Sequence, residues 1–360
     1  MNLTKETEFF QKNLLAWAAT TPRPMPWKGV RDPYRIWLSE IILQQTRVEQ
    51  GRAFYERILV ACPDVFALAA LPEDELMKLW EGLGYYSRAR NLQSAAKFIA
   101  THLNGKFPEK FEEILQLKGV GEYTASAIAS FAYDLPYAVL DGNVYRVLSR
   151  FFGIETPIDS PAGKTQFSKL AAATLIHSAP AKYNQAIMDF GALQCTPRKP
   201  DCPTCPMQQK CAAFTGKKVG LLPVKGKKLV KSRRFFHYFI FRKAENTWIR
   251  KREEKDIWKH LYEFPLIESV TNGESPGDLL LQHGEKIFAG ADYETAEIRS
   301  SEIYTWQLTH RTIEVRFHEL LFVNSSLELA DDFTQIKLTE LKNYAFPRVI
   351  DRYLREKNYL

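Results

Sequence analysis

Four cysteines lie close together in one proline-rich stretch of the sequence, CTPRKPDCPTCPMQQKC, which runs from residue 195 to residue 211. The spacing C-x6-C-x2-C-x5-C lets one compact loop direct four thiolates to a common centre; these are Cys195, Cys202, Cys205 and Cys211. Four thiolates bind either a tetrahedral zinc ion or an iron–sulfur cube. Structural zinc sites commonly contain two close pairs of ligands, and only Cys202 and Cys205 form such a pair. The spacing therefore favours the cluster without excluding zinc. Arg198, Lys199 and Lys210 add the positive charge typical of phosphate contact.

Two acidic residues have surroundings that favour different protonation states. Glu40 lies in YRIWLSEIILQQTRV, where Trp37 one turn before it and Leu43 one turn after it make an apolar helix face. Burial there would raise its pKa and keep it protonated, as a general acid requires. Asp141 precedes an expected helix at 144–151, whose amide donors and dipole favour the ionised form. The pair suits a reaction in which one acid protonates a leaving group and the other stabilises a cationic sugar. Taken singly, Asp141 is also consistent with a helix cap and Glu40 with an ordinary paired acid.

A glycine-containing turn separates two expected helices in LQLKGVGEYTASAIAS. Gly119 and Gly121, with Val120 between them, permit positive φ and a close approach of the backbone. Amides exposed at the start of the second helix would bind an anionic oxygen, for which a DNA phosphate is the obvious candidate. An ordinary turn between two helices is the alternative.

The elements that must position these residues are of two kinds. Up to residue 215 the apolar residues recur with helical spacing, as in PEDELMKLWEGLG, where Leu76, Trp80 and Leu83 share one face. After residue 234 the pattern changes to that of strands. RFFHYFIF is rich in strand-forming residues, and TIEVRFHELLFV alternates as a half-buried strand does. A short amphipathic helix is expected at RVIDRYLREKNYL. A chain of 360 residues with this change of pattern is predicted to form a helical domain and a β-rich one.

Positive charge is concentrated between the two parts. The chain has a formal net charge of +7, and GKKVGLLPVKGKKLVKSRR, residues 216–234, contains eight basic residues and no acid. Such a segment is either a solvated linker or a site of phosphate contact. The sequence also lacks an export signal or an apolar run near the ~18 residues of a membrane span. We therefore expect a soluble, intracellular protein whose bunched cysteines are metal ligands rather than disulfides.

These motifs together resemble a known superfamily. The LKGVGEYT hairpin, the aspartate of VLDGNV and the cysteine loop are similar to the helix-hairpin-helix DNA glycosylases that carry a [4Fe-4S] cluster. PWKGVRDPYRIWLSEIILQQTRV, WEGLGYYSRARNL and YNQAIMDFGALQCTPRKPDC resemble one branch of it, the MutY-type adenine DNA glycosylases. The likeness implies an all-α helix-hairpin-helix domain at 1–215, with its hairpin at 111–132 and its iron–sulfur loop at 195–211. It further implies a basic linker at 216–234 and an α+β, Nudix-like (MutT-like) domain at 235–360 that recognises 8-oxoguanine.

The resemblance also implies roles for particular residues. In that family adenine paired with 8-oxoguanine or guanine is removed from double-stranded DNA by hydrolysis. Glu40 would protonate the adenine, Asp141 would stabilise the sugar cation, and Tyr123 and Asn143 would support them by hydrogen bonding. Other matching positions are Trp27, Lys28 and Gln185 in the adenine pocket, Gln45 and Tyr85 inserted into the duplex, and the hairpin residues Gly119, Val120 and Gly121. A monomeric, cytoplasmic protein associated with the bacterial nucleoid is expected.

Two departures from related patterns bear on this interpretation. Tyr123 stands where related glycosylases with lyase activity have a lysine nucleophile, so a monofunctional hydrolase is expected, with Lys118 the nearest lysine in sequence. In the C-terminal part Leu308, Thr309 and His310 stand where the family has Phe-Ser-His, and Arg252 belongs to an incomplete Nudix pattern, so this part should bind rather than hydrolyse. A glycosylase/lyase for oxidised pyrimidines and a catalytically silent mispair-binding protein remain the alternatives.

Overall fold

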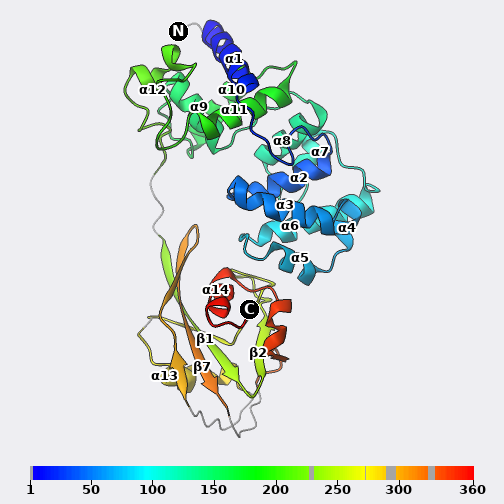
Figure 1. Ribbon diagram of the computed structural model, residues 1–360, viewed down its shortest axis with the longest axis vertical. Coiled ribbons are helices and arrows are strands. Elements are labelled where there is room, and N and C mark those ends of the chain that lie inside the picture. Colours follow the sequence, from blue (N-terminus) through cyan, green and yellow to red (C-terminus); the bar gives the residue numbers. More distant parts are fainter. Residues whose placement is uncertain (1–2, 227–230, 272, 289–296, 323–328) are drawn as a thin grey trace. The chain divides into compact units, whose positions relative to one another are not determined.

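The computed structural model describes residues 3–226, 231–271, 273–288, 297–322 and 329–360. Two compact units divide the chain: residues 1–70 with 91–227, and residues 71–90 with 228–360. The first unit is helical and the second contains all the described strands (Figure 1). The predicted change from helices to strands is therefore confirmed. None of the described helices has the length and apolar character needed to cross a membrane.

Unit 1 consists of helices joined by short connections. They are α1 (Leu3–Thr20), α2 (Pro33–Leu43), α3 (Val48–Ala61), α4 (Val65–Ala70), α6 (Ser87–His102), α7 (Phe111–Leu115), α8 (Glu122–Tyr133), α9 (Gly142–Phe152), α10 (Pro161–Thr174), α11 (Pro180–Leu193), η1 (Gln208–Lys210) and α12 (Ala212–Thr215). Residues 87–90 at the start of α6 group with unit 2. One core joins α1, α9, α10 and α11, with Phe10, Phe151, Phe167 and Phe190 at its centre.

Local signals set where the important helices begin. Asp32 caps α2 by accepting from the backbone of Tyr34 at 2.9 Å, and Pro33 fits the first turn because it has no amide to satisfy. Asp141 caps α9 in the same way, accepting from the amide of Val144 at 2.8 Å. Part of the basic segment 216–226 lies on unit 1, where the Leu222 carbonyl accepts from Arg150 and the Val224 carbonyl from Ile158. Lys227 and Lys228 lie outside the described residues.

Unit 2 contains two sheets. The larger has the order β4-β1-β7-β5 with β6 also paired to β7, and the smaller has the order β3-β2-β8. The strands are β1 (Ser232–Arg242), β2 (Asn246–Lys251), β3 (Tyr262–Glu263), β4 (Leu266–Ser269), β5 (Ile298–Ser300), β6 (Tyr304–Gln307), β7 (Arg311–Leu321) and β8 (Thr334–Lys337). Strands β1 and β7 are parallel, with Ser232 opposite Arg311 and Arg242 opposite Leu321. Unit 2 also contains α5 (Glu73–Trp80), α13 (Pro276–His283), η2 (Gly284–Lys286), η3 (Leu338–Asn343) and α14 (Arg348–Glu356).

The prediction that residues 312–323 form a half-buried strand is wrong in one respect. Glu314 and His318 of β7 are 6% and 0% exposed, so both faces of the strand are covered. Parallel central strands are usually buried on both faces. Glu314 is paired with Arg233, and His318 shares a 2.9 Å hydrogen bond with His237 on β1. The alternating pattern predicted that these polar side chains would face solvent. They are instead buried and bind polar side chains of the neighbouring strand β1.

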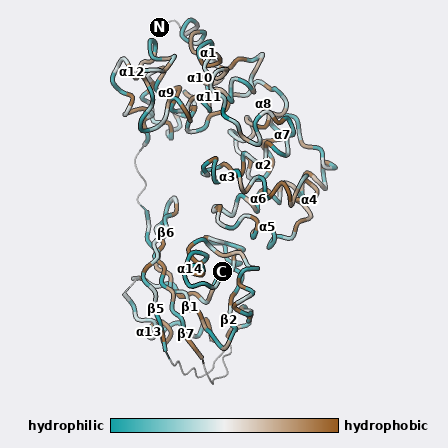
Figure 2. The backbone as a smooth tube through the Cα atoms, in the orientation of Figure 1, coloured by the Kyte–Doolittle hydropathy of each residue, from teal (hydrophilic) through white to brown (hydrophobic). Residues whose placement is uncertain are grey.

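Helix α14 confirms the amphipathic helix expected near the C-terminus. Its Tyr353 ring stacks on Phe317 of β7 with the ring centres 4.0 Å apart. Val349, Ile350 and Leu354 are buried in the same core, while Arg352, Arg355 and Glu356 face solvent. Figure 2 shows hydrophobic stretches along the strands that this helix covers.

Candidate active site

A cavity of about 1000 Å³ opens in unit 1. Its walls come from the loop before α2, from α2 itself, from the start of α8, from the start of α9 and from α11. Glu40, Tyr123, Asp141 and Asn143 all line it, so the structure brings the residues expected to be catalytic to one place. Trp27, Lys28, Gln45 and Gln185 line the same cavity.

Glu40 projects from the buried face of α2. It is 6% exposed, and its neighbours Trp37, Leu38 and Ile41 are almost fully buried. Burial raises the pKa of Glu40 from its ordinary 4.5 to about 7, and the charge of Asp141 acts in the same direction. A hydrogen bond with the Tyr123 hydroxyl opposes the shift. Glu40 is therefore partly protonated at neutral pH, as the sequence predicted from its apolar neighbours.

Asp141 is a helix cap and a cavity residue at once. Its Oδ1 accepts from the amide of Val144 at 2.8 Å, and its Oδ2 accepts from the Asn143 side chain at 2.7 Å. These donors and the charge of Arg146 favour ionisation, yet burial is the largest effect and raises the pKa of Asp141. The expected donors are thus present, but the sequence did not show how deeply the carboxylate is buried.

Arg146, which is 7% exposed, fixes the side chain of Asn143 by hydrogen bonding. The guanidinium of Arg146 donates to the Asn143 side-chain oxygen at 2.8 Å, to the Gly191 carbonyl at 2.6 Å and to the Cys195 carbonyl at 2.7 Å. A Cβ atom at Gly191 would lie 2.6 Å from the Cβ of Asn143, so only glycine allows α9 and α11 to approach this closely.

One wall of the cavity carries two charged residues that the sequence did not single out, Arg23 and Asp189. Asp189 on α11 is 3% exposed and accepts from Lys28 at 2.7 Å and from Arg23 at 3.3 Å. Arg23 lies in the loop before α2, far from Asp189 in sequence. The one available signal was the i, i+4 spacing of Gln185 and Asp189, which places both on one face of helix α11.

Gln45 and Tyr85 share an unusual backbone conformation. Their φ angles are +57° and +49°, in the left-handed region that non-glycine residues rarely adopt. Such strain is retained where function requires a particular side-chain direction. Gln45 lines the cavity at the end of α2, and Tyr85 is 46% exposed.

The predicted hairpin lies between α7 and α8. Gly119 has φ +83°, and a Cβ atom there would lie 2.7 Å from the Cβ of Asn91. Gly121 is the N-cap of α8 without a side-chain cap, and Val120 donates its own amide to the Leu117 carbonyl at 3.0 Å. Position 119 therefore requires glycine. The amide of Val120 already donates a hydrogen bond within the hairpin.

The four clustered cysteines face one small cavity of about 30 Å³. Arg150 on α9 is 3% exposed; it donates to the sulfur of Cys195 at 3.4 Å and to the Thr196 carbonyl at 2.8 Å. Burial raises the pKa of the Cys205 thiol to about 12 and also raises the pKa values of Cys202 and Cys211, so these three thiols resist ionisation without a cation beside them. Within the described ranges, no three His, Cys, Asp or Glu side chains converge closely enough to hold one metal ion.

In unit 2 the Leu308, Thr309 and His310 triplet forms the turn between β6 and β7. The amide of Leu308 donates to the Arg311 carbonyl at 2.8 Å, which closes the turn, and Leu308 packs against the core. Thr309 and His310 are exposed. The Thr309 hydroxyl lies 3.2 Å from the Tyr85 hydroxyl within this unit.

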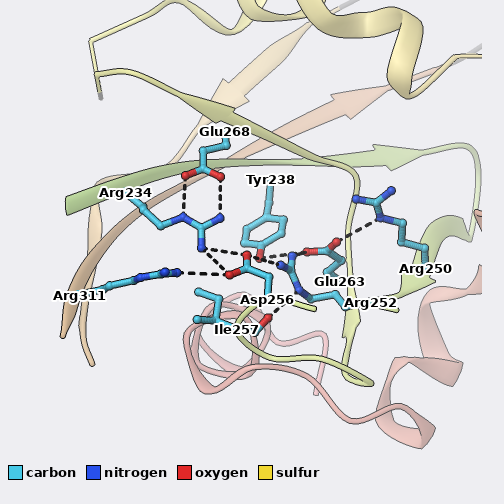
Figure 3. Close-up of polar contacts among 9 residues, drawn as sticks. All are labelled: Arg234, Tyr238, Arg250, Arg252, Asp256, Ile257, Glu263, Glu268 and Arg311. Carbon is cyan, nitrogen blue, oxygen red and sulfur yellow. Dashed lines mark hydrogen bonds and ion pairs between the residues drawn. The ribbon is translucent and has the colours of Figure 1, made fainter. Parts of the chain in front are cut away.

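Arginines neutralise the buried carboxylates where the incomplete Nudix pattern lies. Glu263 is 1% exposed. It lies between Arg250 and Arg252, with which it forms ion pairs (Figure 3). The Tyr238 hydroxyl donates to it at 3.3 Å. Arg252 lies in the segment after β2 and not on a helix. Helix α13 carries Asp278 as its one acidic residue and no arginine. The described part of unit 2 thus holds no cluster of free carboxylates for a metal.

Each of the two units matches a family of known proteins. Residues 38–171 match the HhH-GPD superfamily of base excision DNA repair proteins, and residues 237–356 match the NUDIX domain. An adenine DNA glycosylase of Buchnera aphidicola subsp. Acyrthosiphon pisum is 36% identical over 258 residues, covering 71% of this chain and 73% of that protein. An adenine DNA glycosylase of Mus musculus is 40% identical over 57% of this chain and 42% of its own length.

One solved structure extends the comparison to the fold. A thermostable thymine-DNA glycosylase has a TM-score of 0.56 and 29% sequence identity, covering 59% of this chain and 98% of its own. The expected combination of a helical glycosylase domain and a C-terminal Nudix-like domain is therefore confirmed.

Proposed function

We propose a substrate for this chain: adenine paired with 8-oxoguanine or guanine in double-stranded DNA. The chain belongs to the adenine DNA glycosylases and is a DNA N-glycosylase. The observation that carries this proposal is the pair Glu40 and Asp141 facing one cavity large enough for a purine nucleoside. Burial raises the pKa of both carboxyl groups, that of Glu40 to about 7, but at Asp141 the helix donors and the charge of Arg146 oppose the shift and favour the ionised form.

The proposed reaction begins with proton transfer from Glu40 to N7 of the extruded adenine. The electrons of the C1′–N9 bond then leave with the base, and an oxocarbenium-like sugar forms beside Asp141, which stabilises its positive charge. The oxygen of a water molecule bonds to C1′ and its proton returns to Glu40. Tyr123, which hydrogen-bonds to Glu40, and Asn143, which donates to Asp141, keep the two carboxyl groups in place.

The absence of a lysine at position 123 supports hydrolysis without strand cleavage. Tyr123 has a pKa raised well above its ordinary value by burial, so it remains neutral and offers no amine for a Schiff base. Lys118 lies in the hairpin immediately before Gly119 and is not among the residues that line the cavity. A lyase for oxidised pyrimidines is therefore disfavoured.

We assign contacts with DNA to three further sets of residues. Extruding a base costs a few kcal/mol of stacking, and side chains inserted into the duplex offset part of that cost. We assign this insertion to Gln45 and Tyr85, which hold strained backbone conformations, and assign phosphate contact to the hairpin of Gly119, Val120 and Gly121. The exposed Thr309 beside Tyr85 supports recognition of 8-oxoguanine by the turn of Leu308, Thr309 and His310.

The cysteine loop fits a [4Fe-4S] cluster held by Cys195, Cys202, Cys205 and Cys211. Tetrahedral zinc with bonds of about 2.3 Å would bring the four sulfurs within about 4 Å of one another. The four sulfurs line one common cavity, and the C-x6-C-x2-C-x5-C spacing, which contains a single close pair, favours the larger centre. Arg150 donates to the sulfur of Cys195, as expected for a thiolate ligand. The bound cluster would supply a fixed backbone for the loop that carries Arg198 and Lys199.

We further assign the protein to the cytoplasm, associated with the bacterial nucleoid, and expect it to act as a monomer. Neither unit presents a helix that could span a membrane among its described residues, and the net charge of +7 favours binding to polyanionic DNA.

The test is a single-turnover assay on a duplex with labelled adenine opposite 8-oxoguanine, followed by alkali. Cleavage at adenine only after alkali supports the proposal. Cleavage without alkali at an oxidised pyrimidine would support the lyase, and binding without base release would support a silent mispair binder. Glu40→Gln should abolish release and retain binding, whereas Glu56→Gln, an exposed acid on α3, should leave both unchanged.

A further inference from the structure

A buried carboxylate in the cavity wall has no role in the reaction as derived so far. Asp189 is 3% exposed, and each of its oxygens is engaged. Oδ1 accepts from the Gln185 amide nitrogen at 3.1 Å and from Arg23 at 3.3 Å, and Oδ2 accepts from Lys28 at 2.7 Å. All four side chains line the cavity that contains Glu40.

The carboxylate fixes which end of the Gln185 side chain faces the cavity. An ionised carboxylate only accepts hydrogen bonds, so the amide nitrogen of Gln185 must face Asp189 and the amide oxygen must point the other way. The i, i+4 spacing on α11 holds the two side chains together. Among the described residues, no protein group donates to the Gln185 amide oxygen, which leaves that acceptor for a ligand.

An acceptor fixed in this way distinguishes purines by the group at position 6. The amino group of adenine donates a hydrogen bond to it, whereas the carbonyl of hypoxanthine places two acceptors against each other. If the amide were free to rotate, its nitrogen could donate to that carbonyl, and the distinction would be lost.

We propose that Asp189 is a positioning residue that holds the Gln185 amide oxygen toward the cavity, so that the site selects a purine with a 6-amino group and rejects one with a 6-carbonyl. This inference rests on the proposed function, because it requires the purine to occupy the cavity beside Glu40.

Asp189 also has an electrostatic effect that does not depend on the base. It is the carboxylate that pairs with Arg23 and Lys28, and those cations would otherwise lie beside an adenine that becomes positively charged on protonation. Loss of the carboxylate should therefore slow the release of every base. Only the loss of amide orientation should change the order of preference among bases.

The experiment compares three bases in one duplex, each opposite 8-oxoguanine: adenine, hypoxanthine and unsubstituted purine. Purine has no group at position 6, so its release rate measures every effect except amide orientation. With wild-type protein, single-turnover release of adenine must be detectable; its absence would overturn the proposed function and this inference with it.

For Asp189→Asn we expect the ratio of adenine to hypoxanthine release to fall roughly tenfold or more, the size expected for one good base contact. Relative to the release rate of purine, the release rate of adenine should fall and that of hypoxanthine should rise. Gln185→Met should lower the same ratio, and the double variant should lower it no further. Asp64→Asn, an exposed cap of α4 that keeps its hydrogen bond to Ala67 in either form, is the matched control and should leave the ratio unchanged.

A uniform fall in all three rates for Asp189→Asn, with the ratios preserved, would show that the carboxylate acts through charge or packing alone and would overturn the inference. If Asp189→Asn does not fold, as judged by circular dichroism, Gln185→Met decides the matter: an unchanged adenine to hypoxanthine ratio in that variant overturns the inference equally.

Discussion

Replacing Glu40 with glutamine should make the helical unit more stable, and more so as the pH rises. Burial raises the pKa of Glu40 from 4.5 to about 7, so the unfolded chain ionises at lower pH than the folded one. The resulting cost to folding is absent below about pH 4.5, grows as the pH rises and is complete above about pH 7. Glutamine has nearly the same shape and does not ionise.

The size of the effect follows from the shift of about 2.5 pKa units. At 1.36 kcal/mol per unit, the full cost of keeping Glu40 in the fold is about 3.4 kcal/mol. The same relation gives a cost of about 1.4 kcal/mol at pH 5.5 and nearly the full value at pH 8.5. The free-energy difference between Glu40→Gln and wild type should thus grow by about 2 kcal/mol from pH 5.5 to pH 8.5.

Urea unfolding monitored by far-ultraviolet circular dichroism at both pH values provides the measurement. Glu56→Gln removes an exposed acid from α3 and controls for the general effect of lost charge. If the difference between Glu40→Gln and wild type is the same at both pH values, Glu40 does not have a raised pKa and the assignment of the general acid fails.

Three further outcomes are expected. The single-turnover rate of adenine release should fall about tenfold per unit well above pH 7, because only protonated Glu40 donates, and should also fall at low pH as Asp141, whose pKa burial raises, becomes protonated; a flat profile to pH 9 would contradict this. Thr309→Val keeps the shape of the side chain but removes its hydroxyl, so the preference for 8-oxoguanine over guanine as the opposing base should fall roughly tenfold, while adenine release opposite guanine stays unchanged; equal loss on both duplexes would refute a recognition role. Cys202→Ser should lower the iron content and the visible thiolate-to-iron absorbance, whereas Cys62→Ser should leave both at wild-type levels; zinc in the purified protein in place of iron would refute the cluster.

The sequence predicted what depends on local pattern and missed what depends on distant contacts. The apolar neighbours of Glu40 and the helix that follows Asp141 are visible in short windows, and so is the left-handed glycine at 119. Arg23 and Asp189 lie far apart in the chain and meet only through the fold, so no window contains both. The burial of Glu314 and His318 was missed for the same reason, since it depends on strands pairing on both sides of β7.

Backbone strain was equally invisible in the sequence. Gln45 and Tyr85 matched family positions, but no property of glutamine or tyrosine predicts a positive φ. The surrounding fold imposes that conformation, and it distinguishes these two residues from ordinary surface glutamines and core tyrosines.

Asp141 both caps α9 and lines the cavity, and this combination has a consequence for inherited variants of the protein. Asparagine caps a helix about as well as aspartate, so a single-base change that yields Asp141→Asn leaves α9 intact. Cellular quality control would find nothing misfolded to degrade. The altered protein would accumulate normally and occupy its targets without clearing them, shielding each lesion from the remaining intact copies.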